Sequence, residues 1–180
     1  MTIAAFVLGV VATVLAALSL TWQMIAVRLR GDRPKLTAVI GLYTPDGLVA
    51  TDASSDVRES LLNAAGQLPP GHLIVGVKVV NTGRASFHVG GWAIRADPGG
   101  ASLVPVADAI GGTAVPHDIP PGGSAVFSTT LHQAQRFADV AEGVDGQPRR
   151  IVLTVSSGAR TYATKPLAPA LFSLGSGIRA

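Results

Sequence analysis

Hydrophobic positions follow two different patterns along the chain. Residues 3–27, IAAFVLGVVATVLAALSLTWQMIAV, contain no charged side chain, whereas the later residues form short apolar runs separated by polar and glycine-rich stretches. A helix of this length extends about 37 Å, which exceeds a hydrocarbon core of about 30 Å. The pattern therefore predicts an N-terminal unit over 1–35, made of one transmembrane helix at about 3–27 and a basic juxtamembrane segment.

Two other roles for the apolar segment are less consistent with its sequence. A buried core helix would usually carry polar residues on one side. A cleaved signal peptide begins with a basic region and has an apolar run of about 7–15 residues. No Lys or Arg precedes this run, and the run is longer than a signal peptide requires. We therefore expect the segment to be retained as a membrane anchor.

Alternation of apolar and polar residues predicts several short strands after residue 35. The clearest lie at 36–43, 73–80, 151–156 and 160–164. In 73–80, one row is uniformly apolar and the opposite row is mixed, which is typical of a half-buried antiparallel strand. The segment IPPGGSAVFSTTL, residues 119–131, predicts a tight turn followed by a strand. The side chains on one side of that strand are Ala125, Phe127, Thr129 and Leu131.

Two short helices interrupt the strand pattern. The first is predicted after Asp56, a plausible N-cap with Glu59 three residues on, and it ends near Gly66. The second follows Thr130, whose spacing to Gln133 resembles a capping box. Apolar residues at helical spacing continue that pattern as far as Gly143, and they are Ala134, Phe137, Ala138 and Ala141.

The stretch VVNTGRASFHVGGWAI, residues 80–95, forms a corner between two apolar runs. Asn81 can bond its own backbone, and Gly83 can adopt positive φ. Beyond the corner, the apolar side changes parity between Val89 and Trp92, so Gly90-Gly91 predicts a β-bulge that turns Trp92 into the core. A phosphate-binding loop would require a strand-to-helix junction with a Lys or acidic partner, and the stretch has neither.

Together these elements predict a mainly β fold. Six to eight short strands and two small helices, without internal repeats, favour an antiparallel two-sheet β-sandwich over residues 36–167. Gly and Pro are frequent, with 21 and 12 copies, as expected for many short strands joined by turns. Residues 168–180 are predicted to form a flexible tail, from which Leu171 and Leu174, like Leu167 before them, are candidates to dock on the domain.

Three segments resemble a known type of domain. LIVGVKVVNTGRASFHVGGWAI, IPPGGSAVFSTTL and SSGARTYATKPL are similar to the middle, late and last strands of immunoglobulin-like domains in uncharacterised single-pass membrane proteins of actinobacteria and their phages. The resemblance covers about residues 73–167. It implies an immunoglobulin-like fold and supplies no catalytic residue.

The net charge of +3 is concentrated beside the apolar segment. Arg28, Arg30, Arg33 and Lys35, less Asp32, account for all of it, and residues 36–180 carry ten basic and ten acidic side chains. A nucleic-acid-binding domain would spread basic residues over a folded face, so no nucleic-acid partner is predicted. Because no Lys or Arg precedes the segment, the positive-inside rule predicts an external N-terminus and a cytoplasmic β domain.

Small residues recur every four positions in the apolar segment. They form one narrow face of the predicted helix, and they are Ala5, Gly9, Thr13 and Ala17. Such faces allow close packing of transmembrane helices, so this face is a candidate for homo-oligomerisation, and the alternative is that an Ala-rich helix produces the stripe by chance. The predicted partner of the helix is the lipid bilayer.

Residues with catalytic chemistry are sparse and scattered. The four histidines, His72, His88, His117 and His132, have no metal-binding spacing. His117 and Asp118 are adjacent, and neighbours on a strand point to opposite faces. There is no G-x-S-x-G motif, no paired-carboxylate pattern and no Cys. The sequence therefore predicts no catalytic, cofactor-binding or metal-binding residues.

The function that fits this set of features is non-enzymatic. We expect a membrane-anchored interaction module, of the scaffold or adaptor type, with a cytoplasmic β-sandwich that contacts a protein partner. An exported, envelope-facing domain that binds a ligand or a cell-wall component is the alternative, and membrane topology distinguishes the two. A hydrolase whose active site is assembled from distant residues is the third hypothesis.

Overall fold

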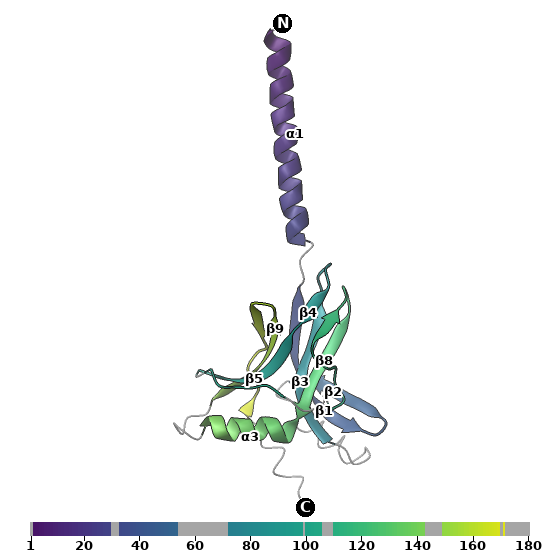
Figure 1. Cartoon of the computed structure of the whole chain (residues 1–180), viewed down its shortest axis with the longest axis vertical. Helices are drawn as coiled ribbons and strands as arrows, with labels where there is room; N and C mark the ends of the chain where they lie inside the picture. The colour runs from purple at the N-terminus through teal and green to yellow at the C-terminus, as the bar shows by residue number, and fades with distance from the viewer. Residues whose placement is uncertain are drawn as a thin grey trace, which may run out of the picture.

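The computed structural model describes residues 2–29, 33–53, 72–98, 100–105, 110–142, 149–169 and 171. Helix α1 (Thr2–Leu29) contains the apolar segment and projects from the end of the domain at which β1 begins (Figure 1). Its described side chains are exposed on every side. The predicted helix after Asp56 lies outside the described residues.

The longer sheet is built on two long strands. β1 (Pro34–Thr44) pairs with the whole length of β3 (His72–Asn81), from Pro34 opposite Asn81 to Tyr43 opposite His72. β2 (Gly47–Asp52) and β8 (Ser124–Thr130) flank them, so the order is β2-β1-β3-β8, and every pair is antiparallel.

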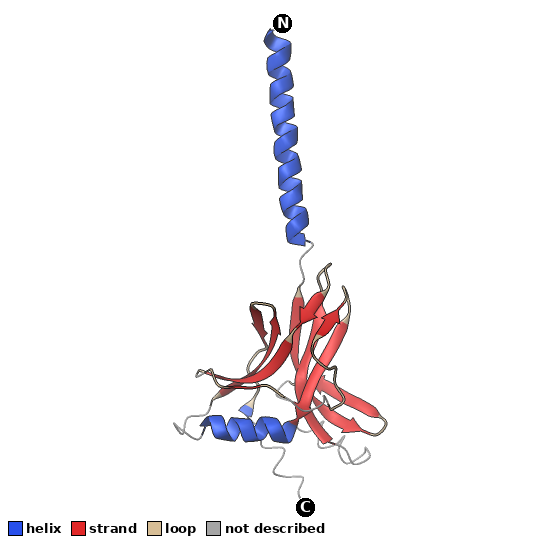
Figure 2. Cartoon of the chain, viewed as in Figure 1, coloured by secondary structure: helices blue, strands red, loops and turns tan. Residues whose placement is uncertain are grey.

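The second sheet has four strands in the order β10-β9-β5-β6. They are β5 (Gly91–Asp97), β6 (Ser102–Leu103), β9 (Arg150–Ser157) and β10 (Arg160–Ala163). Two short strands, β4 (Phe87–Val89) and β7 (His117–Ile119), form a separate antiparallel ribbon. Figure 2 shows these strands as the main component of the domain, with helix α3 (Leu131–Glu142) at the end opposite α1.

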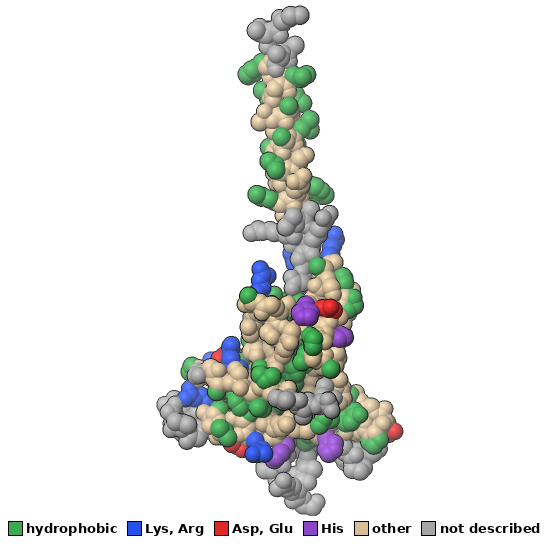
Figure 3. Space-filling view, viewed as in Figure 1, with side chains coloured by type: hydrophobic (Ala, Val, Ile, Leu, Met, Phe, Trp, Pro, Cys, Tyr) green, Lys and Arg blue, Asp and Glu red, His purple; other side chains and the backbone are tan. Residues whose placement is uncertain are grey.

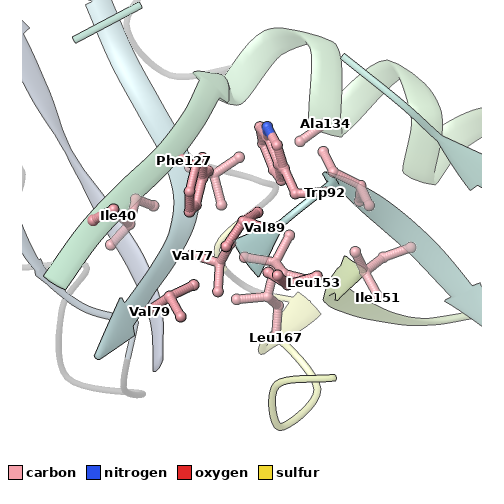
Figure 4. Close-up of a cluster of buried hydrophobic side chains, with 14 of the residues drawn as sticks. Ile40, Val77, Val79, Val89, Trp92, Phe127, Ala134, Ile151, Leu153 and Leu167 are labelled. Atoms are coloured by element: carbon pink, nitrogen blue, oxygen red, sulfur yellow. The ribbon is translucent and has the colours of Figure 1, made fainter. Parts of the chain in front are cut away.

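Side chains from both four-stranded sheets, from the ribbon and from α3 meet in one core (Figure 4). Fully buried members are Ile40, Val75, Val77, Val79, Phe87, Val89, Ile94, Ile119, Phe127, Leu131, Ala134, Leu153 and Val155. The predicted apolar row of β3 contributes its three valines, and Phe127 comes from the row predicted for β8. Leu131, placed in that same row by the sequence pattern, is instead the first residue of α3. The period-two pattern thus located the central strands correctly.

The change of parity at Gly90-Gly91 has the predicted cause. Gly90 donates its N–H to the Ser156 carbonyl at 2.9 Å, and Gly91 is the register partner of that same residue. Two residues thus stand opposite one, as in a bulge, where the chain passes from the ribbon into the second sheet. Trp92 is turned inward and is 6% exposed, beside Phe127 and Ala134 (Figure 4).

α3 begins where its sequence predicted. The Gln133 N–H donates to Thr130 Oγ1 at 3.3 Å, so Thr130 caps the helix. The Gln133 side chain does not return to Thr130 as a capping box requires, because it accepts a hydrogen bond from Thr129 Oγ1 instead. Leu131 and Ala134 are buried in the core, and Phe137 packs against it.

Three local features differ from the sequence-based expectations. β2 was not expected, and it extends the longer sheet beyond β1. Gly83 does not adopt positive φ, whereas Gly122 and Gly158 do. Leu171, from the segment predicted as a tail, is 3% exposed and lies in the core with Leu167, so the packed unit extends beyond residue 167. Leu174 lies outside the described residues.

Candidate interaction surfaces

The corner after β3 is organised by the side chain of Asn81, which is fully buried. Asn81 Nδ2 donates to the carbonyl of Ala85 at 2.7 Å and to that of Ile119 at 3.0 Å. Asn81 Oδ1 accepts from the Gly83 N–H at 3.0 Å, which is the local bond expected from its sequence position. A single amide therefore joins the 82–86 loop to the end of β7.

Backbone hydrogen bonds attach this corner to two further segments. The Asn81 N–H donates to the Gly123 carbonyl at 3.0 Å, and the Gly122 N–H donates to the Asn81 carbonyl at 2.8 Å. Both the N–H and the hydroxyl of Thr82 donate to the carbonyl of Arg33, at 2.9 and 2.8 Å. The start of β1, the 82–86 loop and the β7–β8 turn are thus one hydrogen-bonded unit.

Exposed basic side chains lie at this end of the domain. They come from the start of β1, from the 82–86 loop and from the β9–β10 hairpin, and they are Arg33, Lys35, Arg84 and Arg160. Figure 1 shows the β9–β10 hairpin pointing toward the end at which α1 leaves the domain, and Figure 3 shows basic side chains there. We call these four residues the basic end. The described segments 33–35, 82–86, 120–123 and 158–160 contain no acidic residue.

The opposite end of the domain carries both signs of charge. Asp46 occupies the β1–β2 turn, and α3 carries Arg136 and Asp139, all three exposed. β1 separates the two ends by about 33 Å, at about 3.3 Å per residue. This distance is several times the Debye length of about 8 Å at physiological salt. Dissolved ions therefore screen the interaction between charges at the two ends.

The outer edge of β2 is a second candidate surface. Within the part of the chain that the structure describes, β2 pairs only with β1. Its sequence, GLVATD, has no Lys or Pro to protect an edge, and Val49 is 52% exposed. A strand edge of this kind offers unpaired backbone groups to an extended peptide.

An apolar groove lies between residues 103–105 and α3. Its volume is about 430 Å³, and Phe137, Val140 and Arg136 line the α3 side. A second cavity of about 450 Å³ lies beside residues 35–38 and is lined in part by Asp52 and Lys165. No group that would select a ligand is buried among the described lining residues, so neither is assigned a ligand.

The histidines do not form a metal site among the described residues. His88 and Asp118 are register partners in the β4–β7 ribbon, and their Nδ1 and Oδ1 atoms are 2.7 Å apart. Both side chains are more than half exposed, at 55% and 69%, and exposed pairs contribute little to stability. The adjacent His117 instead packs edge-on against Phe127. His72 and His132 are exposed on separate elements.

The small-residue face of α1 has one feature relevant to packing. Thr13 Oγ1 donates to the Gly9 carbonyl at 2.8 Å, so its hydroxyl is satisfied within the helix. Gly9, Thr13 and Ala17 are exposed, and the side chain of Ala5 lies outside the described residues. Self-association through this face stays a prediction.

The chain matches no protein family, and neither a curated protein nor a solved structure shows significant similarity to it. The resemblance to immunoglobulin-like domains therefore also stays a prediction. The features of the molecule that bear on its function are α1, the basic end and the edge of β2.

Proposed function

We propose that this protein is a non-enzymatic, membrane-anchored interaction module whose β domain faces the cytoplasm. The observation that carries the proposal is α1. Phe6–Met24 is long and apolar enough to cross a membrane, and its described side chains are exposed on all sides. An apolar helix without a protein surface to cover it is stable in lipid and costly in water.

The orientation follows from the charges on either side of the helix. Residues 1–27 contain no Lys or Arg, whereas Arg28, Arg30, Arg33 and Lys35 follow within eight positions of the apolar part of α1. Basic residues close to a membrane helix are retained on the cytoplasmic side during insertion. This asymmetry supports an external N-terminus.

Strand order supports an immunoglobulin-like sandwich as the fold of the domain. Immunoglobulin domains pair their first, second and fifth strands in one sheet and their third, sixth and seventh in the other. If β2, β4 and β7 are treated as additions, β1-β3-β8 and β10-β9-β5 follow this order. Trp92 then occupies the strand on which these domains often carry a buried Trp. Two strands depart from the seven-strand pattern. β2 flanks β1, and β6 pairs with β5 in the second sheet, whereas the fourth strand of the seven-strand pattern belongs to the first sheet.

A protein partner is expected at the edge of β2, through pairing of an extended segment with its outer backbone groups. Photo-crosslinkers placed at Val49, on this edge, and at Val140, beside the apolar groove, test the assignment in the intact membrane. Crosslinks to a partner at Val49 but not at Val140 are expected. The reverse result would transfer the partner site to the groove.

Membrane fractionation and topology reporters test the proposal as a whole. The full-length chain should remain in the membrane fraction after a carbonate wash. A fluorescent protein fused after Ala180 should fluoresce, and a phosphatase that is active only outside the cytoplasm should be silent there. Replacing Arg28, Arg30, Arg33 and Lys35 with Glu should weaken that orientation.

Two outcomes would contradict the proposal in different ways. Release of a shortened chain into the soluble fraction would identify the apolar segment as a cleaved signal peptide. An active phosphatase on the unaltered chain would place the domain outside, and it would favour an envelope-facing domain that binds a ligand or cell-wall component.

A further inference from the structure

We infer that the basic end of the β domain binds the anionic lipid headgroups of the leaflet on its own side of the membrane, and that this contact fixes the orientation of the domain. The inference rests on the proposed membrane anchoring. It adds Arg84 and Arg160, which are distant in the sequence and belong to the folded domain, to the basic residues that follow α1.

Covalent geometry places the basic end close to the headgroups. Four peptide units connect Leu29, the last residue of α1, to Arg33. Four units extend about 14 Å at most. The headgroup region of one leaflet is about 5–8 Å thick, and the field of an anionic surface reaches about one Debye length, roughly 8 Å, beyond it. Arg33 is therefore held within or near this field.

Hydrogen bonds extend that proximity to the neighbouring basic residue. The two bonds from Thr82 to the Arg33 carbonyl attach the 82–86 loop to the start of β1. Arg84 lies in this loop, whose conformation is set by Asn81 through Gly83 and Ala85. The backbone at Arg84 therefore loses little conformational freedom when the loop meets a charged surface. Preorganisation of this kind increases affinity.

The distribution of charge favours a surface over a small anion. The basic residues lie at the ends of three separate segments. Of the four, only Lys35 lines a described cavity, where Asp52 and Lys165 are also present, so the basic end does not converge on one pocket. A phosphate ion or nucleotide would need basic groups converging on one pocket. A membrane is the extended anionic surface to which α1 already holds this end of the domain.

The test uses the full-length chain inserted in lipid vesicles with its domain outward. The sequence has no Cys, so Ala85→Cys gives a single attachment site, in the loop of Arg84, for an environment-sensitive fluorophore. Vesicles of phosphatidylcholine alone are compared with vesicles that also contain phosphatidylserine. We expect a blue-shifted, more intense emission only with phosphatidylserine, and we expect high salt to reverse it.

Charge variants distinguish binding by the basic end from attraction between the lipid and exposed basic residues elsewhere on the domain. Each basic residue near an anionic surface contributes a factor of about five in affinity. Removing two of them, with Arg84→Gln and Arg160→Gln together, should therefore abolish most of the phosphatidylserine response. Arg136→Gln, an exposed change of the same kind on α3, is the matched control and should leave the response intact. Arg84→Lys should retain it.

The possible failures are separable. Carbonate-resistant flotation with vesicles reports insertion of α1 independently of the fluorophore, so its loss contradicts the proposed anchoring itself. Insertion with equal emission in both lipids overturns the inference alone. A phosphatidylserine response that inorganic phosphate or a short RNA displaces also overturns it, because the basic end would then be a soluble-anion or nucleic-acid site.

Discussion

The two ends of the β domain are closed by different kinds of interaction. At the end next to α1, the buried amide of Asn81 satisfies backbone groups of two other segments. At the opposite end, α3 covers the core with Leu131 and Ala134, close to Trp92. Hydrogen bonds fix direction and distance, whereas apolar packing mainly requires volume to be filled. The end that presents basic residues is therefore the more precisely positioned one.

The same two ends also differ in the charges that they carry. The four residues of the basic end are all basic, and Asp118 in β7, near that end, is paired with His88. The α3 end carries Asp46, Arg136 and Asp139. A surface with one sign of charge attracts an extended charged partner, while a mixed surface is suited to solubility. Substitutions at the two ends test the difference in packing and in charge, and the largest effect on stability is expected beneath α3.

Trp92→Ala should reduce the free energy of unfolding by about 3–5 kcal/mol, because a buried aromatic side chain is removed beneath α3. Denaturation of the full-length chain in detergent, followed by circular dichroism in the strand region, measures the change. An unaltered midpoint would mean that Trp92 contributes no core packing and is available to a ligand.

Asn81→Ala should destabilise the opposite end by about 2–3 kcal/mol, because the Ile119 carbonyl and the Gly83 N–H lose their partner where Asn81 is buried. Hydrogen exchange should increase mainly at residues 82–86 and 119–123. Asn81→Asp keeps the acceptor for Gly83 but places a buried carboxyl group against the carbonyls of Ala85 and Ile119, so it should destabilise the corner at least as much. Equal exchange across the domain would show that the corner is not an independent structural unit.

Thr130→Ala should cost about 1 kcal/mol, the usual effect of removing an N-cap. Thr130→Ser should retain most of the stability because it keeps the hydroxyl acceptor. Thermal unfolding of both variants measures the difference. If Ser is as destabilising as Ala, the Thr130 methyl group rather than the cap is important at the start of α3.

Arg84→Gln should change the stability by no more than about 0.5 kcal/mol, as expected for an exposed side chain. The same variant should impair the lipid response described above. A loss of stability comparable to that of Asn81→Ala would assign Arg84 a structural role and would weaken its use as a lipid contact.

Much of the fold could be predicted from local patterns. Period-two alternation located β1, β3, β8 and β9, because one face of each strand packs on the core. β2 could not be recognised in this way. Five of its six residues are exposed, and its strand conformation depends on pairing with β1 rather than on its own sequence.

The candidate surfaces were only partly visible in the sequence. Asn81 was identified as a turn residue, but its bond to Ile119 joins residues 38 positions apart, and no local pattern predicts that pairing. The pairing of His88 with Asp118 could not be predicted for the same reason, since the two residues are 30 positions apart. Arg33 and Lys35 formed an obvious cluster, whereas Arg84 and Arg160 joined it only through the strand topology.

The length of β1 has a mechanical consequence for whatever binds this protein. With the basic end on the bilayer, the eleven residues of β1 act as a spacer that holds α3 and the β1–β2 turn some 33 Å above the headgroups, at about 3.3 Å per residue. A partner lying flat on the lipid, such as an amphipathic helix, could reach only the lowest part of the domain. A partner that engages the far end must be tall enough, or extended enough, to meet it at that height.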